Sequence, residues 1–164
     1  MEIGQVAIAE QYRSHILKRY RYWTLLLHEQ QRYLGRAVAW LSREGDMQRF
    51  SGLWSGELVE LQYITREYEA ALDRVGWKPD HINYAMLGNF FHEHAGHGHM
   101  HIVPRYAPRP TPLTFMRTVF EDDRWGKHYA PATPMEVPRD VLTAIVAVLQ
   151  DELEKNGQKN EPPT

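Results

Sequence analysis

Histidines are concentrated in one short part of the chain, where five of the nine lie between His92 and His101. Side chains on a β-strand alternate between its faces, so His97, His99 and His101 would point the same way, about 6.5–7 Å apart. The next residues, which would face the core, are apolar: Met100 and Ile102. Gly96 has no side chain to keep a ligand away from the backbone. The spacing predicts a row of imidazoles facing a cleft that suits a bulky, anionic substrate.

Imidazole chemistry suits attack on phosphorus. The ordinary pKa of the ring is about 6.5, so one ring can be an uncharged nucleophile while its neighbour donates a proton. A central histidine that attacks phosphorus forms a phosphoramidate and divides transfer to water into two easier steps. Neighbouring donors stabilise the charge on the phosphate oxygens. We therefore expect phosphoryl chemistry with no required cofactor.

A metal site is the alternative interpretation of the cluster. With His92 and His94 nearby, there are enough imidazoles for a tetrahedral zinc or nickel site. A purely structural row is disfavoured, because every buried ring nitrogen would need a hydrogen-bond partner. Three other histidines are interpreted as ordinary surface or core residues: His15, His81 and His128.

Composition limits the classes of partner. The 164 residues are near the usual size of one domain, and 19 basic against 21 acidic residues give a net charge of −2. That charge gives no broad positive field, so we expect no nucleic-acid partner.

The absence of cysteine excludes disulfides, thiol nucleophiles and thiolate metal sites. The longest strongly apolar run, residues 141–149, is shorter than the ~20 residues of a membrane helix, and the N-terminus does not resemble a signal peptide. We therefore expect a cytoplasmic protein that does not contact membranes.

The first half of the chain predicts two strands and two helices. Residues 5–19 have an imperfect apolar stripe that favours a polar helix. Residues 22–27 and 37–41 are β-rich, with a turn at Tyr33-Leu34-Gly35 between them. From residue 55 to about residue 76, apolar positions recur every three or four residues, which is typical of a half-buried helix.

The second half predicts a strand pair, a long loop and a last helix. Residues 82–87 and 97–103 are extended by propensity and would pair antiparallel, the second ending at Pro104. Residues 107–134 are rich in proline and are predicted to be irregular. Pro138 fits the first turn of a helix that ends near Gly157. The chain is thus interpreted as one domain, residues 1–157, with a flexible tail at 158–164.

The run HGHMHIVPR at residues 97–105 resembles the signature of the histidine-triad (HIT) superfamily. The resemblance covers about residues 21–106, because the strand, turn, helix and strand before the motif arrive in the order of the family. It implies an α+β fold, with a bent antiparallel β-sheet and flanking helices, and a homodimer. It also implies nucleotidyl transfer or hydrolysis.

The resemblance further implies a role for individual residues. His99 corresponds to the nucleophile that becomes nucleotidylated, with His97 and His101 as its orienting and phosphate-contacting partners. Asn89 corresponds to a residue that reaches the phosphates, and Gly96 stands where relatives often supply a hydroxyl. His28 resembles a ribose-contacting position. Residues 122–131 resemble segments that wrap over the site in some relatives, and their aromatic rings would suit base stacking.

The expected activity is a nucleotide hydrolase that acts at the α-phosphate of dinucleoside polyphosphates or nucleoside phosphoramidates, through a covalent nucleotidyl-histidine. A nucleotidyltransferase to a phosphate acceptor and a non-catalytic nucleotide-binding module are the alternatives. The small-molecule nucleotide is the expected partner, and a divalent metal such as Mg²⁺ could accompany its phosphates.

Overall fold

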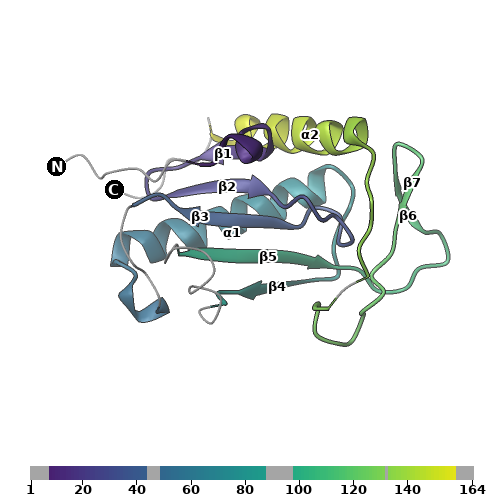
Figure 1. The fold of residues 1–164 in the computed structure, drawn as a ribbon, viewed down its shortest axis with the longest axis horizontal. Coiled ribbons are helices and arrows are strands. Elements are labelled where there is room, and N and C mark those ends of the chain that lie inside the picture. The colour runs from purple at the N-terminus through teal and green to yellow at the C-terminus, as the bar shows by residue number, and fades with distance from the viewer. Residues whose placement is uncertain (1–7, 44–48, 88–97, 132, 158–164) are drawn as a thin grey trace.

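The computed structural model describes residues 8–43, 49–87, 98–131 and 133–157. Its centre is a five-stranded antiparallel sheet in the order β1-β2-β3-β5-β4 (Figure 1). The strands of this sheet are β1 (Ile16–Arg19), β2 (Trp23–Leu27), β3 (Ala37–Leu41), β4 (His81–Ala85) and β5 (His99–Arg105). The other elements are the helices α1 (Ser55–Arg74) and α2 (Arg139–Gly157) and a hairpin of β6 (Leu113–Phe115) and β7 (Thr118–Phe120). The predicted α+β class, an antiparallel sheet with flanking helices, is confirmed.

The helix α1 lies across one face of the sheet, as Figure 1 shows. Its buried side recurs with helical spacing, as the sequence predicts. The buried apolar residues of this side are Leu61, Ile64, Tyr68, Ala71 and Leu72. They share one core cluster with Trp23, Leu25 and Leu27 of β2. This face of the sheet is therefore the core.

The helix α2 follows the β1 edge of the sheet (Figure 1). Gln150 donates through Nε2 to the carbonyl of Ile16 at 2.7 Å. Lys18 donates to the carbonyl of Leu153 at 3.3 Å and pairs with the buried carboxylate of Glu67 on α1 at 2.7 Å. Thus β1, α1 and α2 are joined at one corner of the molecule.

The predicted helix at residues 5–19 is wrong over the described part. Residues Glu10–His15 form a short 3₁₀-helix, and Ile16–Arg19 form β1. None of the residues of the 3₁₀-helix is buried, so a longer helix here would have had no apolar face to pack. Pairing with β2 instead satisfies the backbone from Ile16 onward.

Two further boundaries differ from the prediction. The strand β5 continues through Pro104 to Arg105, although Pro104 was expected to end it. The pairing of β5 with β3 stops at Ile102, so the missing N–H of Pro104 points beyond the end of β3 and interrupts no bond. The segment 107–134, expected to be irregular, contains the β6–β7 hairpin, whose turn residues Met116 and Arg117 have φ of 47° and 63°. Its Met-Arg turn lacks the Asn-Gly sequence that signals such hairpins.

The other predicted elements are confirmed. The strands β2 and β3, the turn between them, α1, the antiparallel pair β4–β5 and α2 directly after Pro138 all lie where the sequence places them. The tail at 158–164 lies outside the described residues. Within the described ranges, no helix has the length and apolar character needed to cross a membrane.

Candidate active site

The sheet face opposite α1 carries the histidines. His99 of β5 lies opposite Trp40 of β3, and His101 lies opposite Val38. Val38 in turn pairs with Leu26 of β2. His99 and His101 are half-buried, whereas the intervening Met100 is buried in the core, so the predicted alternation of faces is confirmed for these residues.

The imidazole rings of His99 and His101 contact each other edge to face, with centroids 4.9 Å apart and planes at 78°. His99 also stacks on the indole of Trp40, at 5.9 Å and 25°. The ring of His28, which follows β2 directly, lies 6.2 Å from that of His101. Each ring of this group therefore has an aromatic neighbour that restricts its orientation.

Two of these imidazoles are held uncharged. Burial, followed by the nearby His99 and Arg36, lowers the pKa of His101 to about 4. Burial, followed by Arg36 and His101, lowers the pKa of His28 to about 3. The backbone N–H of Gln30 donates to Nδ1 of His28 at 2.9 Å, so the neutral ring of His28 carries its proton on Nε2.

A pocket of about 310 Å³ opens over these side chains. Its polar lining residues are His28, Glu29, His99 and His101. Its apolar lining comes from the N-terminal segment, from β2 and from β3, and includes Ile8, Tyr12, Leu26, Val38 and Trp40. Pockets that orient a ligand commonly combine an apolar wall with a few convergent polar groups. This one could hold a flat apolar ring against its apolar lining and an anionic group beside the imidazoles.

Comparisons with known proteins agree on the fold. No family model matches the sequence, and neither does any curated protein. A histidine-triad protein from Marinobacter aquaeolei superposes with a TM-score of 0.62 at 18% identity, covering 93% of this chain and 98% of that one. One from Sinorhizobium meliloti has a TM-score of 0.64 at 14% identity, covering 92% and 98%. The chain has the histidine-triad fold. A diadenosine triphosphate hydrolase from Plasmodium falciparum, solved with cyclomarin A, also superposes, with a TM-score of 0.54 at 10% identity over 96% and 84%.

The histidine-triad fold brings together three of the residues that the sequence singles out: His28, His99 and His101. The other candidates, Asn89, Gly96 and His97, lie outside the described residues, as do His92 and His94 of the alternative metal site. Among the residues that the structure describes, no three histidine, aspartate or glutamate side chains are placed to hold a metal ion.

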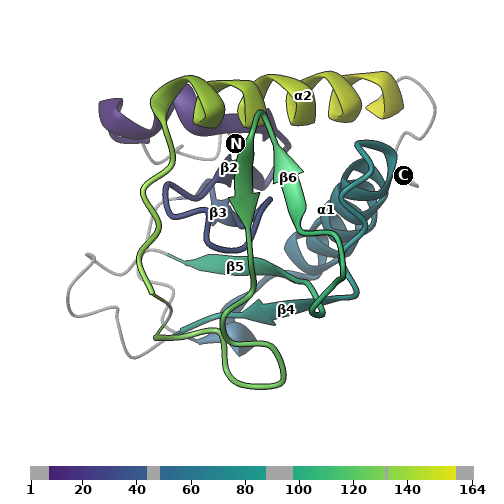
Figure 2. The same cartoon turned by 90° about the vertical axis from the view of Figure 1, so that its right-hand side faces the viewer.

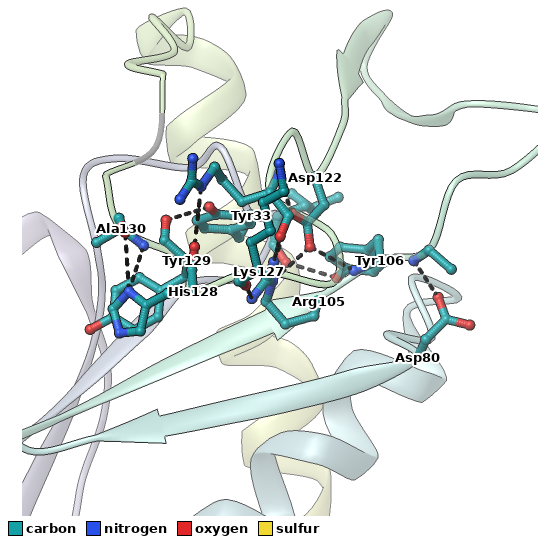
Figure 3. A network of polar contacts seen from close by, with 12 residues as sticks. Tyr33, Asp80, Arg105, Tyr106, Asp122, Lys127, His128, Tyr129 and Ala130 are labelled. Carbon is teal, nitrogen blue, oxygen red and sulfur yellow. Dashed lines mark hydrogen bonds and ion pairs between the residues drawn. The ribbon is translucent and has the colours of Figure 1, made fainter.

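The aromatic rings of residues 122–131 do not stack in the pocket. Trp125 instead stacks on His81 at 5.9 Å and 14°, and Tyr129 is buried against Tyr33 and Val103. The segment is attached to the sheet by the polar network in Figure 3, in which Arg105 pairs with Asp122. Neither ring lines the pocket over His99 and His101, so base stacking by this segment stays a prediction.

Sequence reasoning missed Trp40 and Arg36. Both lie on the histidine face because they alternate with the core-facing Ala37 and Ala39; Trp40 lines the pocket, and Arg36 lies outside that lining, over the ring of Tyr129. The sequence shows the alternation of residues 37–41, but it does not show that this strand, rather than another, pairs with β5.

Proposed function

We propose that the protein hydrolyses nucleotides at the α-phosphate, acting on dinucleoside polyphosphates or nucleoside phosphoramidates through a covalent nucleotidyl-His99. The observation that carries the proposal is the contact of His99 with His101 in a pocket whose other lining residues are mostly apolar. The histidine-triad fold supports it, as does the similarity to a diadenosine triphosphate hydrolase.

The reaction has two displacements at one phosphorus atom. A ring nitrogen of His99 forms a bond to the α-phosphorus, and the bond from phosphorus to the leaving group breaks, its electron pair going to the leaving group, which takes up a proton. Water then attacks the same phosphorus and the P–N bond breaks. This second step releases the nucleoside monophosphate and regenerates the imidazole of His99, and the proton of the water passes to the site.

The surroundings of His99 suit a nucleophile. The Trp40 indole and the His101 ring hold the imidazole on two sides, so little rotational freedom is lost on attack. The pKa of His101 lies well below neutrality, so His101 places no positive charge next to the nucleophile at pH 7. An adjacent cationic imidazole would repel a second proton and compete for the phosphate.

The nucleotide would lie with its base against the apolar wall. Leu26, Val38 and Trp40 provide a surface for a flat ring, and His28 lines the same pocket beside His101. Because Nδ1 of His28 already accepts a backbone N–H, its Nε2–H is the group left to donate to a ribose hydroxyl. The proposal also includes contacts of His97 and Asn89 with the phosphates and a contact of the Gly96 backbone with them. It further includes that the protein is a homodimer and is cytoplasmic.

The proposal is tested by comparing wild type with His99→Ala. Both are incubated with diadenosine tetraphosphate and with adenosine phosphoramidate, with and without Mg²⁺, and nucleoside monophosphate release is followed by chromatography. We expect release by wild type and a loss of roughly three orders of magnitude in His99→Ala. Acid-labile, base-stable label on the wild-type protein after a quench with radiolabelled substrate would identify the intermediate.

His128→Ala is the matched control, because His128 is exposed and bonds only within its own loop. We expect it to retain wild-type activity. Equal release by wild type and a folded His99→Ala would overturn the role of His99. Release that requires a phosphate acceptor would instead identify a nucleotidyltransferase.

A further inference from the structure

Arg36 is a cation on the histidine face of the sheet, close enough to His101 to lower the pKa of that ring. It precedes β3, and Val38, two residues later on the same face, pairs directly with His101. Residues offset by two along neighbouring strands are diagonal neighbours, about 7–8 Å apart and within reach of a long side chain. The effect of Arg36 on the pKa of both His101 and His28 agrees with this placement.

Arg36 has no counter-charge in the described part of the protein. It makes no ion pair there, and its Nε is buried without a hydrogen-bond partner. Arg105, on the same face, shows what such a residue ordinarily requires, because Asp122 accepts from its Nε at 2.6 Å and from its Nη2 at 3.0 Å. A partly buried guanidinium without a partner is costly. Among the described residues, the positive charge beside His101 is therefore not compensated.

The ring of Tyr129 supports the guanidinium of Arg36 on one side. Its carbon lies 5.6 Å from the centre of the buried Tyr129 ring, which packs on Val103, two residues beyond His101 on the same face. The neighbouring Nδ1 of His101 is likewise buried and has no hydrogen-bond partner among the described residues. Two adjacent side chains therefore each present a polar atom that this part of the protein does not satisfy.

We propose that Arg36 binds the phosphate of the leaving group, and so selects nucleotides that carry a second phosphate after the one attacked. The inference rests on the proposed function and makes it more specific. His101 lies between Arg36 and the nucleophile His99, so the guanidinium reaches the phosphate beyond the α-phosphate. It neutralises the charge that this phosphate gains as its bond to the α-phosphorus breaks. The substrate class is a dinucleoside polyphosphate rather than a phosphoramidate, whose leaving group has no phosphate.

The test compares two substrates in Arg36→Gln. We expect kcat/KM for diadenosine tetraphosphate to fall by about tenfold to a hundredfold, the range for one hydrogen bond to a charged group. For adenosine phosphoramidate we expect less than about a threefold change, since its leaving group gives Arg36 no phosphate to bind. Arg36→Lys, which keeps the charge without the planar fork, should recover part of the loss. An equal fall for both substrates, or no fall for either, would overturn the proposal.

Arg32→Gln is the matched control. Arg32 lies in the same turn and loses the same charge, but it donates to the carbonyl of Thr133 at 2.9 Å, away from the histidines. We expect its ratio of the two kcat/KM values to equal that of wild type. A thermal melt of each variant confirms that it is folded.

A binding measurement separates this inference from the proposed hydrolysis. In the His99→Ala protein, calorimetry should show ADP binding about tenfold more tightly than AMP, because ADP supplies the second phosphate. Adding Arg36→Gln should remove this preference and leave AMP affinity unchanged. A preference for ADP that survives Arg36→Gln would overturn the inference, whether or not the wild-type protein hydrolyses anything.

Discussion

His28 and His101 are half-buried where a positive charge is costly, and both lie near the cation of Arg36. With both rings neutral, the positive charge that remains beside His101 among the described residues is that of Arg36. The same arrangement links the acid stability of the fold to the site. In the unfolded chain these imidazoles regain their ordinary pKa of about 6.5.

Acid should therefore destabilise the protein through these residues. Between pH 6.5 and about pH 4, the unfolded chain binds protons at His28 and His101 that the folded protein does not bind. The free energy of unfolding then falls as the pH falls, by at most about 1.4 kcal/mol per pH unit for each histidine. Urea unfolding at a series of pH values measures this slope.

The variants His101→Asn and His128→Asn distinguish the contribution of the site to this pH dependence from that of the rest of the protein. His101→Asn should flatten the slope between pH 6.5 and pH 4, and His128→Asn, at an exposed position, should leave it as in wild type. If His101→Asn keeps the full slope, the pKa of His101 is not depressed in the folded protein.

At the residue scale, the sequence predicts that the histidines share one face of a strand better than it predicts what surrounds them. The alternation of His97, His99 and His101 is a local property and needs only a strand. Trp40 and Arg36 join the site because β3 pairs with β5, about sixty residues further along the chain, and no short-range pattern specifies such pairing. The neutral state of His28 and the missing partner of Arg36 depend on burial, which only the assembled sheet determines.

At the scale of the elements, the turn between β2 and β3 packs on α1 and sets the position of Arg36, the residue that follows it. Gly35 has φ of +83°, and a Cβ there would come within 2.7 Å of Cδ2 of Leu72 on α1. Its carbonyl also accepts the hydroxyl of the buried Tyr68 at 2.6 Å. The glycine therefore allows the turn to pack directly on α1, and Arg36 is the next residue.

Gly35→Ala should destabilise the protein more than Gly76→Ala does. Gly76, at the end of α1, has almost the same φ, +85°, with nothing within 4 Å of a built Cβ. Gly76→Ala thus isolates the backbone cost, about 1–2 kcal/mol. Gly35→Ala adds overpacking against Leu72, about 1–3 kcal/mol more. Denaturant unfolding compares the two, and equal losses would show that α1 moves away at little cost.

Periodicity explains which elements are predictable. The helices α1 and α2 and the strands β2 and β3 each bury a continuous apolar face, and the sequence shows it. The segment before β1 has no such face, and the β6–β7 hairpin has only three residues in each strand. Their structures are decided by partners that are distant in sequence.

For the whole molecule, one ion pair attaches the chain after β5 to the sheet. Arg105 is 4% exposed, and besides Asp122 it donates to the carbonyls of Arg124 at 2.6 Å and Lys127 at 3.0 Å (Figure 3). In Figure 2 the chain from β7 passes on the side of the sheet away from α1 before it reaches α2. The contacts of Arg105 hold this path together with the hydroxyl of Tyr33, which donates to the carbonyl of Tyr129 at 2.5 Å and so helps to place Tyr129 under Arg36.

Asp122→Asn should therefore cost about 3–5 kcal/mol, since it leaves a buried guanidinium only partly paired. Asp80→Asn is the control, because the Arg109–Asp80 pair at 3.1 Å is partly exposed and should contribute about 0–1 kcal/mol. Chemical unfolding gives both values. Limited proteolysis should also cut Asp122→Asn within residues 121–131 faster than wild type or Asp80→Asn. Similar behaviour of the two variants would mean that other contacts hold this segment.

The position of β5 between β3 and β4 has a consequence for how the protein is made. β4 pairs only with β5 in this sheet, and β3 is open on that side until β5 arrives. A chain still emerging from the ribosome can form the β2–β3 hairpin and α1, but it cannot close the sheet before residue 105 is translated. Premature termination before His99 would therefore leave a product in which β4 has no partner strand and one edge of β3 is exposed, and such a fragment would be prone to aggregate.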